Sequence, residues 1–300
     1  MFFRLLILAL LLPAATLAAE KQRALEVVLI PADGGTEEGT RADFAPVFNA
    51  VARITGLQFT LRVGQSYNAV VEAMCNRSAD VAFLGPVAYV QAHERGCAEL
   101  LAVAIENGKS VYYAGIFARA GGPITKIGDL KGHSIAFGDI NSASSFVFPM
   151  AMILGAKLDP IRDLGAVRLT GSHANSLAAL TQGQVEAASL SFESFEKAVN
   201  QGAANSKDLK VVARSVAIPN PPIAMGTHLP PELKLKLKTA FAGLATAPGV
   251  TPEMIRGYGG RKVDGYDANF PEAQFSVPAK MMETIDDAMK GKILKKASQP

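Results

Sequence analysis

Strand-like and helix-like segments alternate along the sequence in a strand, helix, strand order that begins twice. The first series reads LEVVLIPA, DFAPVFNAVARITG, LQFTLRV, YNAVVEAMC and ADVAFLG, over residues 25–85. The second starts with HSIAFGD at residue 133 and continues through AVRLTG and ANSLAALTQG to VEAASLS. Such alternation is typical of parallel-rich sheets with helices on both faces. We therefore expect an α/β fold with two βαβ lobes.

The connections between the lobes are indicated by the segments that flank the second series. It follows VYYAGIFARA and precedes the proline-rich SVAIPNPPIAMG, which predicts crossings near 112–118 and near 215–223. The helices expected after the second crossing are too few for a further lobe, so we expect them to return to the first one. The predicted division is lobe 1, residues 20–114 plus 219–300, and lobe 2, residues 115–218, joined by a two-segment hinge.

The first 19 residues predict a secretory signal peptide, 1–19. Arg4 precedes an apolar run, and small residues stand just before the charges that begin at Glu20. A membrane anchor is the alternative, but a spanning helix needs roughly 20 apolar residues, and this run is interrupted by a proline. We expect cleavage near Ala18 or Ala19 and a periplasmic protein.

Two cysteines, Cys75 and Cys97, are present in the chain. An even count in an exported protein favours a disulfide between them, with free buried thiols as the alternative. Two cysteines without paired histidines nearby supply too few ligands for zinc. No cofactor fingerprint occurs either, so neither a metal nor a cofactor is expected.

The charge balance indicates no nucleic-acid partner. Lys and Arg number 30 against 27 Asp and Glu, and Arg4 is lost with the leader. No basic block or stripe of arginine and aromatic residues is present. With 49% hydrophobic residues the chain can bury two cores, and we expect a monomer.

The turn GDINSASSFVFP, residues 138–149, is the most informative polar segment. It follows a strand and starts a helix, so it lies at the carboxyl end of the sheet, where open α/β lobes bind ligands. The first N–H groups of a helix and its dipole favour an anion, and Ser142, Ser144 and Ser145 add hydroxyl donors. A single capping serine is the alternative, but three serines exceed what a cap needs. A nucleophilic serine would need a base and an elbow motif that this turn lacks.

Other residues are expected at the cleft for weaker reasons. Tyr67 and His173 each open a helix, thirteen residues before Asp80 and Glu186 respectively, which suggests equivalent positions in the two lobes. Tyr112 falls at the first crossing, where packing is the alternative to ligand contact.

Glu193 follows the strand AASLS and is also expected to point toward the cleft. It could hold a cationic group of the ligand or simply face water. The residue type and its place therefore leave both uses open.

Three segments resemble the periplasmic solute-binding proteins of phosphonate, phosphite and phosphate ABC importers. They are SYNAVVEAMCNRSADVAFLGPVAYV, DLKGHSIAFGDINSASSFVFP and GSHANSLAALTQGQVEAASLS. The second is the most specific, because the family pattern reads Asp, two residues, Ser-Thr-Ser-Gly, then an apolar run to a proline. The resemblance covers the mature chain and implies a bilobed periplasmic-binding-protein fold of type II-like organisation.

The resemblance also implies roles for the expected site residues. Ser142 and Ser144, with the helix start, would hold the phosphorus-bound oxygens, and the residues that complete the pocket would be Tyr67, Tyr112 and His173. Glu193 would receive the ammonium group of an aminophosphonate.

Three residues depart from the family pattern: Ala143 replaces threonine, Ser145 replaces glycine, and Pro221 stands where a second acid would be. Losing that acid weakens the case for an aminophosphonate, because a buried ammonium needs compensating charge. The oxyanion could therefore be phosphonate, phosphite or phosphate.

These features together predict a binding protein rather than an enzyme. It is expected to carry a small anion to the membrane permease of an ABC importer. The alternatives are an input protein for a sensor kinase, a ferric-ion binding protein that uses the tyrosines, and, least favoured, a phosphoester hydrolase.

Overall fold

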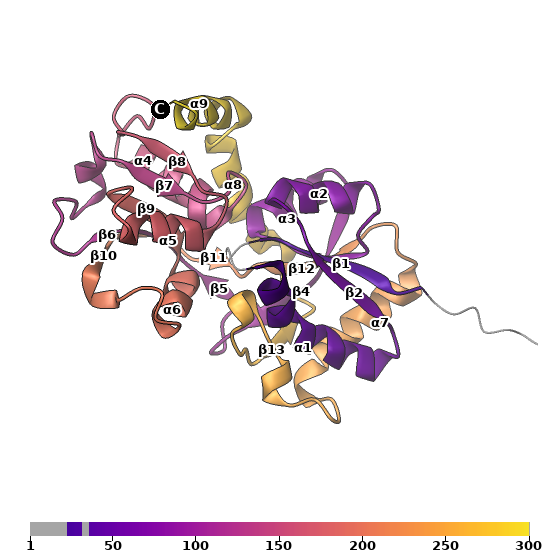
Figure 1. Ribbon diagram of the computed structural model, residues 1–300. Helices are drawn as coiled ribbons and strands as arrows, with labels where there is room; N and C mark the ends of the chain where they lie inside the picture. The colour runs from indigo at the N-terminus through magenta and orange to yellow at the C-terminus, as the bar shows by residue number, and fades with distance from the viewer. Residues whose placement is uncertain (1–22, 32–35, 300) are drawn as a thin grey trace, which may run out of the picture.

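The structure, a computed structural model, describes residues 23–31 and 36–299 and forms two lobes, each built on one sheet (Figure 1). The predicted signal peptide lies outside the described residues. Within those ranges, no helix has both the length and the apolar character needed to cross a membrane.

The first lobe contains a six-stranded mixed sheet in the order β13-β4-β12-β3-β1-β2. β1 pairs in parallel with β2 and β3, whereas β12 and β13 run antiparallel to their neighbours. β12 comes from beyond the second lobe and inserts between β3 and β4, which ties the two ends of the lobe together. The strands are β1 (Leu25–Leu29), β2 (Phe59–Val63), β3 (Val81–Phe83), β4 (Ala98–Ile105), β12 (Pro222–Gly226) and β13 (Gly265–Asp267).

The second lobe repeats this plan with five strands in the order β10-β6-β9-β7-β8. β7 pairs in parallel with β8 and β9, and β6 runs antiparallel to both β9 and β10. Each lobe therefore combines three parallel strands with antiparallel ones, as the doubled strand and helix pattern predicts. The strands are β6 (Ala114–Arg119), β7 (Ile135–Phe137), β8 (Val167–Leu169), β9 (Ala187–Ser191) and β10 (Leu209–Arg214).

A two-stranded antiparallel ribbon connects the lobes. It pairs β5 (Val111–Tyr112) with β11 (Ile218–Pro219), and these strands lie at the two crossings expected from the sequence. The boundaries proposed at residues 114 and 219 stay a prediction.

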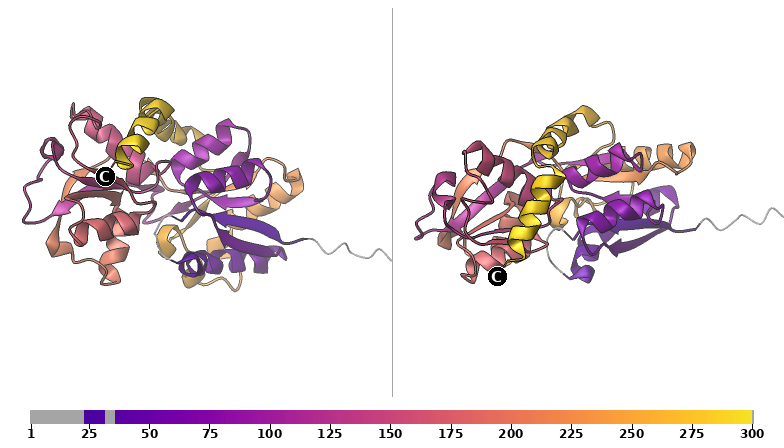
Figure 2. Two further views of the ribbon diagram at one scale, coloured as in Figure 1. Left: turned by 45° about the horizontal axis from the view of Figure 1, so that its top comes forward. Right: turned by 90° about the horizontal axis from the view of Figure 1, so that it is seen from above.

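Helices cover both faces of each sheet, and Figure 2 shows them from two further directions. In the first lobe α1 packs with α7 and α2 with α3; in the second, α5 packs with α6. The helices are α1 (Glu37–Thr55), α2 (Tyr67–Cys75), α3 (Pro86–Glu94), α4 (Phe148–Gly155), α5 (His173–Thr181), α6 (Phe192–Asn200), α7 (Pro231–Ala242), α8 (Ser276–Thr284) and α9 (Asp287–Ala297). Short helices are η1 (Ile127–Leu130), η2 (Ala143–Val147), η3 (Ser206–Asp208), η4 (Leu244–Thr246), η5 (Pro252–Met254), η6 (Tyr258–Gly260) and η7 (Glu272–Phe275).

The last two helices differ from the expectation that residues 219–300 return to the first lobe. α8 packs on both α3 and α4, and α9 contacts β8 of the second sheet. Ile285 and Ile293 are fully buried and join the apolar core of the second lobe. Because these apolar side chains find a partner surface there, the chain passes between the lobes a third time, in yellow at the top of Figure 1.

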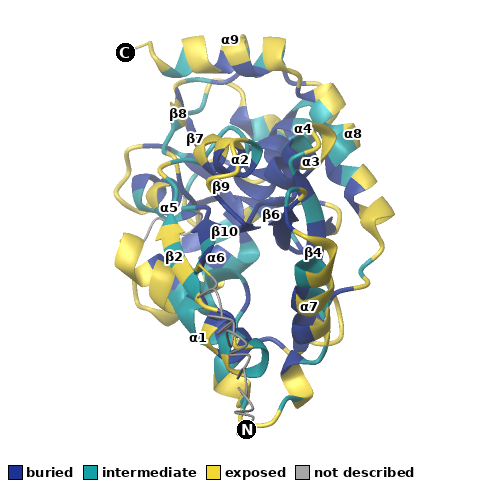
Figure 3. Cartoon of the chain, turned by 90° about the vertical axis from the view of Figure 1, so that its right-hand side faces the viewer, coloured by how far each residue is buried: buried dark blue, intermediate teal, exposed yellow. Residues whose placement is uncertain are grey.

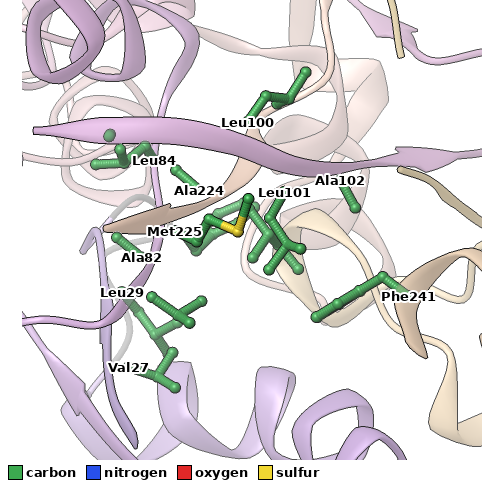
Figure 4. Close-up of a cluster of buried hydrophobic side chains, with 14 of the residues drawn as sticks. Val27, Leu29, Ala82, Leu84, Leu100, Leu101, Ala102, Ala224, Met225 and Phe241 are labelled. Atoms are coloured by element: carbon green, nitrogen blue, oxygen red, sulfur yellow. The ribbon is translucent and has the colours of Figure 1, made fainter. Parts of the chain in front are cut away.

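The core of the first lobe explains why its strands read as apolar runs. β1 is almost entirely buried, since helices cover the sheet on both sides. Figure 3 shows the same contrast along the chain, with buried residues in the middle of the molecule and exposed ones on the outer helices. Val27, Leu29 and Met225 lie among the side chains of the cluster in Figure 4, with Phe241 of α7 nearby. Each fully buried side chain of this size contributes roughly 1.5–3 kcal/mol.

The predicted disulfide is present in the structure. Cys75 at the end of α2 and Cys97 just before β4 are bonded, with their Cα atoms 4.7 Å apart. The bond links two segments that flank β3 in the sequence.

Candidate functional site

Two equivalent helices begin with residues that the sequence analysis predicted for the ligand site. α2 starts at Tyr67 and α5 at His173, and both side chains are buried. Each helix is capped by the serine before it, Ser66 or Ser172, whose hydroxyl accepts a hydrogen bond from the N–H three residues on. The two lobes therefore present Tyr67 and His173 from equivalent positions.

The acidic residues of the same repeat have a different task. Asp80 accepts a hydrogen bond from the N–H of Glu26 (2.8 Å), and Glu186 accepts one from the N–H of Ser134 (2.9 Å). Each also contacts a histidine ring: His228 is 3.2 Å from Asp80, and His133 is 2.7 Å from Glu186. Both acids precede the strand β3 or β9, at the end opposite to the cleft, so they stabilise the sheets and not the ligand.

The serine turn forms an unusual helix start. Residues 143–147 make a π-helix, η2, in which the N–H of Val147 bonds the carbonyl of Ser142 (3.0 Å). π-Helical turns are rare in proteins, and those that occur are often found at functional sites. The Ser142 hydroxyl accepts from the N–H of Ser145 (3.1 Å), so Ser142 caps this helix. Ser142, Ser144 and Ser145 are all buried.

Pro149 explains how the turn is attached to the sheet. A proline has no N–H, so Pro149 cannot bond the carbonyl of Ser145 as an α-helix would require. That carbonyl instead accepts hydrogen bonds from the N–H of Gly138 (3.2 Å) and from the hydroxyl of Ser189 (2.6 Å). Gly138 directly follows β7 and Ser189 lies in β9, so the serine turn is fixed to two neighbouring strands of the sheet.

Ser145 packs against the strand that precedes the turn. Its Oγ is buried and has no hydrogen-bond partner among the described residues. A Cβ atom at Gly138 would lie only 2.3 Å from this oxygen, so only glycine fits at that position. The ligand contact expected of Ser145 stays a prediction.

Tyr112 joins the hinge ribbon to the serine turn. Burial raises the pKa of its hydroxyl, and a hydrogen bond with the Ser144 side chain opposes that effect in part. The Tyr112 hydroxyl therefore stays protonated and can act as a donor beside Ser144.

His173 is held in one tautomer. Its Nδ1 lies 3.0 Å from the backbone N of Ser191, which can only donate, so Nδ1 is the acceptor. A neutral ring then carries its proton on Nε2, which leaves that nitrogen as a donor.

Glu193 stands in the first turn of α6 with one oxygen, Oε2, buried and unpartnered within the described ranges. The pKa of its carboxyl is raised to about 7, chiefly by burial; the nearby charges of Glu196 and Glu106 add to the rise, and a backbone hydrogen bond and Arg261 oppose it. Glu193 thus titrates near neutral pH. Its negative charge also acts on the Tyr112 hydroxyl, so the two side chains are neighbours.

The structure adds two residues that the sequence analysis did not place at the site. The ring centre of Tyr258 in η6 lies 6.1 Å from that of Tyr112 and 6.1 Å from that of His173. Asp139 accepts a hydrogen bond from the N–H of Tyr67 (3.2 Å) and so connects the two lobes. Tyr258 stands between glycines far along the chain, and that setting was the only sequence signal for it.

No group of three or more His, Cys, Asp or Glu side chains in the ranges that the structure describes is arranged to hold a metal ion. The donors at this place are hydroxyls, a ring N–H and the start of a helix. Such groups suit an oxyanion.

The chain is similar to known substrate-binding proteins. Residues 27–266 match the family model described as "ABC transporter, phosphonate, periplasmic substrate-binding protein". The chain is 28% identical over 243 residues to the phosphate-import protein PhnD of Mycolicibacterium smegmatis, covering 77% of this chain and 74% of that one. It is 23% identical over 236 residues to the phosphonates-binding periplasmic protein of Escherichia coli, covering 77% of this chain and 69% of the relative.

A solved structure shows the same fold. PhnD1 of Prochlorococcus marinus, in complex with methylphosphonate, superposes with a TM-score of 0.75 at 14% identity, covering 87% of this chain and 98% of that one. The bilobed fold expected from the sequence is therefore confirmed. The chain belongs to the family of periplasmic substrate-binding proteins of phosphonate ABC transporters.

Proposed function

We propose that this protein captures a small phosphorus oxyanion in the periplasm and presents it to the membrane permease of an ABC importer. The observation that carries the proposal is the buried serine turn, where η2 begins; η2 packs on the second sheet and contacts α3 of the first lobe. We also propose that the protein is exported, that it is a monomer, and that it releases its ligand chemically unchanged.

The donors around the turn suit a phosphorus oxyanion. The first N–H groups of a helix have no partner within the helix, and the helix dipole favours negative charge there. Ser144 adds a directed hydroxyl, and protonated Tyr112 lies beside it. His173, with its proton on Nε2, would supply a donor from the same lobe as the serine turn, and Tyr67, at the start of α2, is the residue that we propose to contribute from the first lobe.

The named relatives support the phosphorus oxyanion as the ligand class. One is a phosphate-import protein, one binds phosphonates, and one structure holds methylphosphonate. We propose phosphonate, phosphite or phosphate for this chain on that basis.

The oxyanion class can be tested with a panel of four ligands: phosphite, phosphate, methylphosphonate and 2-aminoethylphosphonate. A ligand at about 100 times its dissociation constant stabilises the fold by roughly 2.7 kcal/mol. We expect at least one of the four ligands to raise the melting temperature by an amount that corresponds to this stabilisation. The size of the shift then ranks the four ligands by affinity. If none raises it, the proposed function is wrong.

Glu193 supports a ligand whose tail carries a positive charge, although Pro221 stands where a second acid would be. A buried carboxylate without a partner is costly unless a cation or a proton compensates it. Because the pKa of Glu193 is raised, the closed cleft favours its protonated form up to about pH 7. Above that pH, closing around an uncharged tail buries an ionised carboxylate, whereas an ammonium tail neutralises it.

We therefore expect the affinity for 2-aminoethylphosphonate relative to methylphosphonate to rise by about tenfold or more between pH 5.5 and pH 8, the scale of a hydrogen bond between charged groups. Calorimetric titration at several pH values measures this ratio. The Glu193→Gln variant is the control, since titration of the phosphonate itself affects both proteins equally. A ratio with the same pH dependence in wild type and variant would show that Glu193 does not face the tail.

A further inference from the structure

Two helices, one in each lobe, reach across the cleft from the same position. α3 (Pro86–Glu94) and α6 (Phe192–Asn200) are both nine residues long and both follow a central strand of their sheet. Gln91 and Lys197 are each the sixth residue of their helix. Each also lies 24 residues after the equivalent cleft residue, Tyr67 or His173. The internal repeat of the two lobes therefore extends to these side chains.

The first bond runs from lobe 1 to lobe 2. The Gln91 side-chain nitrogen lies 3.1 Å from Oδ1 of Asn141, in the segment between β7 and the serine turn. The Lys290 ammonium of α9 donates to the same oxygen (3.2 Å). Asn141 is fixed in turn because its N–H bonds the Asp139 carboxylate (2.7 Å).

The second bond runs from lobe 2 to lobe 1. The Lys197 ammonium lies 2.7 Å from the Asp43 carboxylate of α1, and both side chains are largely buried, at 21% and 27% exposed. Glu196, the neighbour of Lys197, also forms an ion pair with Arg261 of the first lobe (3.3 Å). A cavity of about 330 Å³ lies at this contact, with Asp43 and Lys197 in its wall.

The two bonds involve helices on opposite faces of the first sheet. In Figure 1, α3 runs along the upper face of the first sheet and α1 along the lower one, with the hinge ribbon between the lobes. Hydrogen bonds of this length break when the two atoms separate by about 1 Å. Both bonds therefore require the closed arrangement of the lobes.

We infer that Gln91 and Lys197 are a symmetry-related pair of clasps, positioning residues that hold the cleft closed without contacting the ligand. The inference rests on the proposed function, because a clasp affects affinity only if ligand is bound by both lobes. Contacts made only in the closed state increase the population of that state. They slow ligand release more than they speed ligand binding.

The test uses the full mature chain with methylphosphonate and 2-aminoethylphosphonate as probes. Gln91→Ala should release the bound probe about threefold to tenfold faster, the range of one neutral hydrogen bond, and Asp43→Ala about tenfold faster, because its bond is charged. The double variant should show the product of both effects, since the two clasps share no partner. Gln182→Ala is the matched control, because that exposed glutamine bonds Gln184 within its own lobe. Stopped-flow displacement measures the release rates.

A second readout separates the clasps from the proposed function. Small-angle scattering of the ligand-free proteins should give a larger radius of gyration for Gln91→Ala and Asp43→Ala than for wild type and Gln182→Ala. If wild type binds none of the panel, the proposed function fails, and the scattering result still decides whether the clasps favour closure. Release rates and radii equal to wild type in both variants would overturn the inference.

Discussion

Ser144→Ala weakens the binding of the best panel ligand by about tenfold to a hundredfold, and it lowers the stability of the ligand-free protein by only about 1 kcal/mol, through the lost hydrogen bond to Tyr112. The Ser144 hydroxyl has the Tyr112 side chain as its neighbour and does not cap the helix. A hydrogen bond to a charged acceptor contributes roughly 1.5–3 kcal/mol, which sets the size of the loss. Calorimetric titration and thermal unfolding of the same samples measure both quantities.

Ser142→Ala is the matched control for this prediction. Its hydroxyl accepts the N–H of Ser145, so its removal costs the cap and lowers the stability of the ligand-free protein by about 1 kcal/mol. Each variant loses one serine hydroxyl, and the two positions are two residues apart. Equal affinity in wild type and Ser144→Ala would show that the Ser144 hydroxyl does not bind the ligand and that the serine turn is an ordinary helix start.

Loss of the disulfide destabilises the protein by about 3 kcal/mol. Cys75 and Cys97 are 22 residues apart, and closing a loop of that length removes entropy from the unfolded chain. Urea unfolding of the Cys75→Ser, Cys97→Ser double variant beside wild type measures the difference in the free energy of unfolding.

Reduction of the wild type with a thiol reductant should reproduce that loss, while the double variant should not respond. A second check is intact mass after alkylation of native, unreduced protein, where no label should be incorporated. Two alkylated thiols would show that the protein carries no such bond.

The local part of the site could be predicted from the sequence because its signals are local. A serine-rich turn between a strand and a helix must lie at the carboxyl end of the sheet, and Tyr67 and His173 each stand at a helix start. The periodicity of the sequence could not show the π-helix. Because Pro149 has no N–H, the carbonyl of Ser145 accepts hydrogen bonds from the Gly138 N–H and the Ser189 hydroxyl instead.

Contacts between distant segments were the part that the sequence did not reveal. Tyr258 reaches Tyr112 and His173 only because η6 folds back to the cleft, and no periodic pattern encodes that return. The same holds for α9, whose apolar residues fit either lobe and which packs on β8. The pairing of Gln91 with Asn141 likewise depends on how the two lobes meet.

The most direct test of the anion site is a crystal structure of the protein grown with saturating methylphosphonate. The phosphorus-bound oxygens should lie within hydrogen-bonding distance, about 2.7–3.2 Å, of the Ser144 hydroxyl and of N–H groups at the start of η2. Tyr112 and His173 should contact the same group, with the clasps at Gln91 and Lys197 formed. A ligand bound elsewhere, or a serine turn that holds no phosphorus-bound oxygen, would contradict the proposed capture of an oxyanion at this helix.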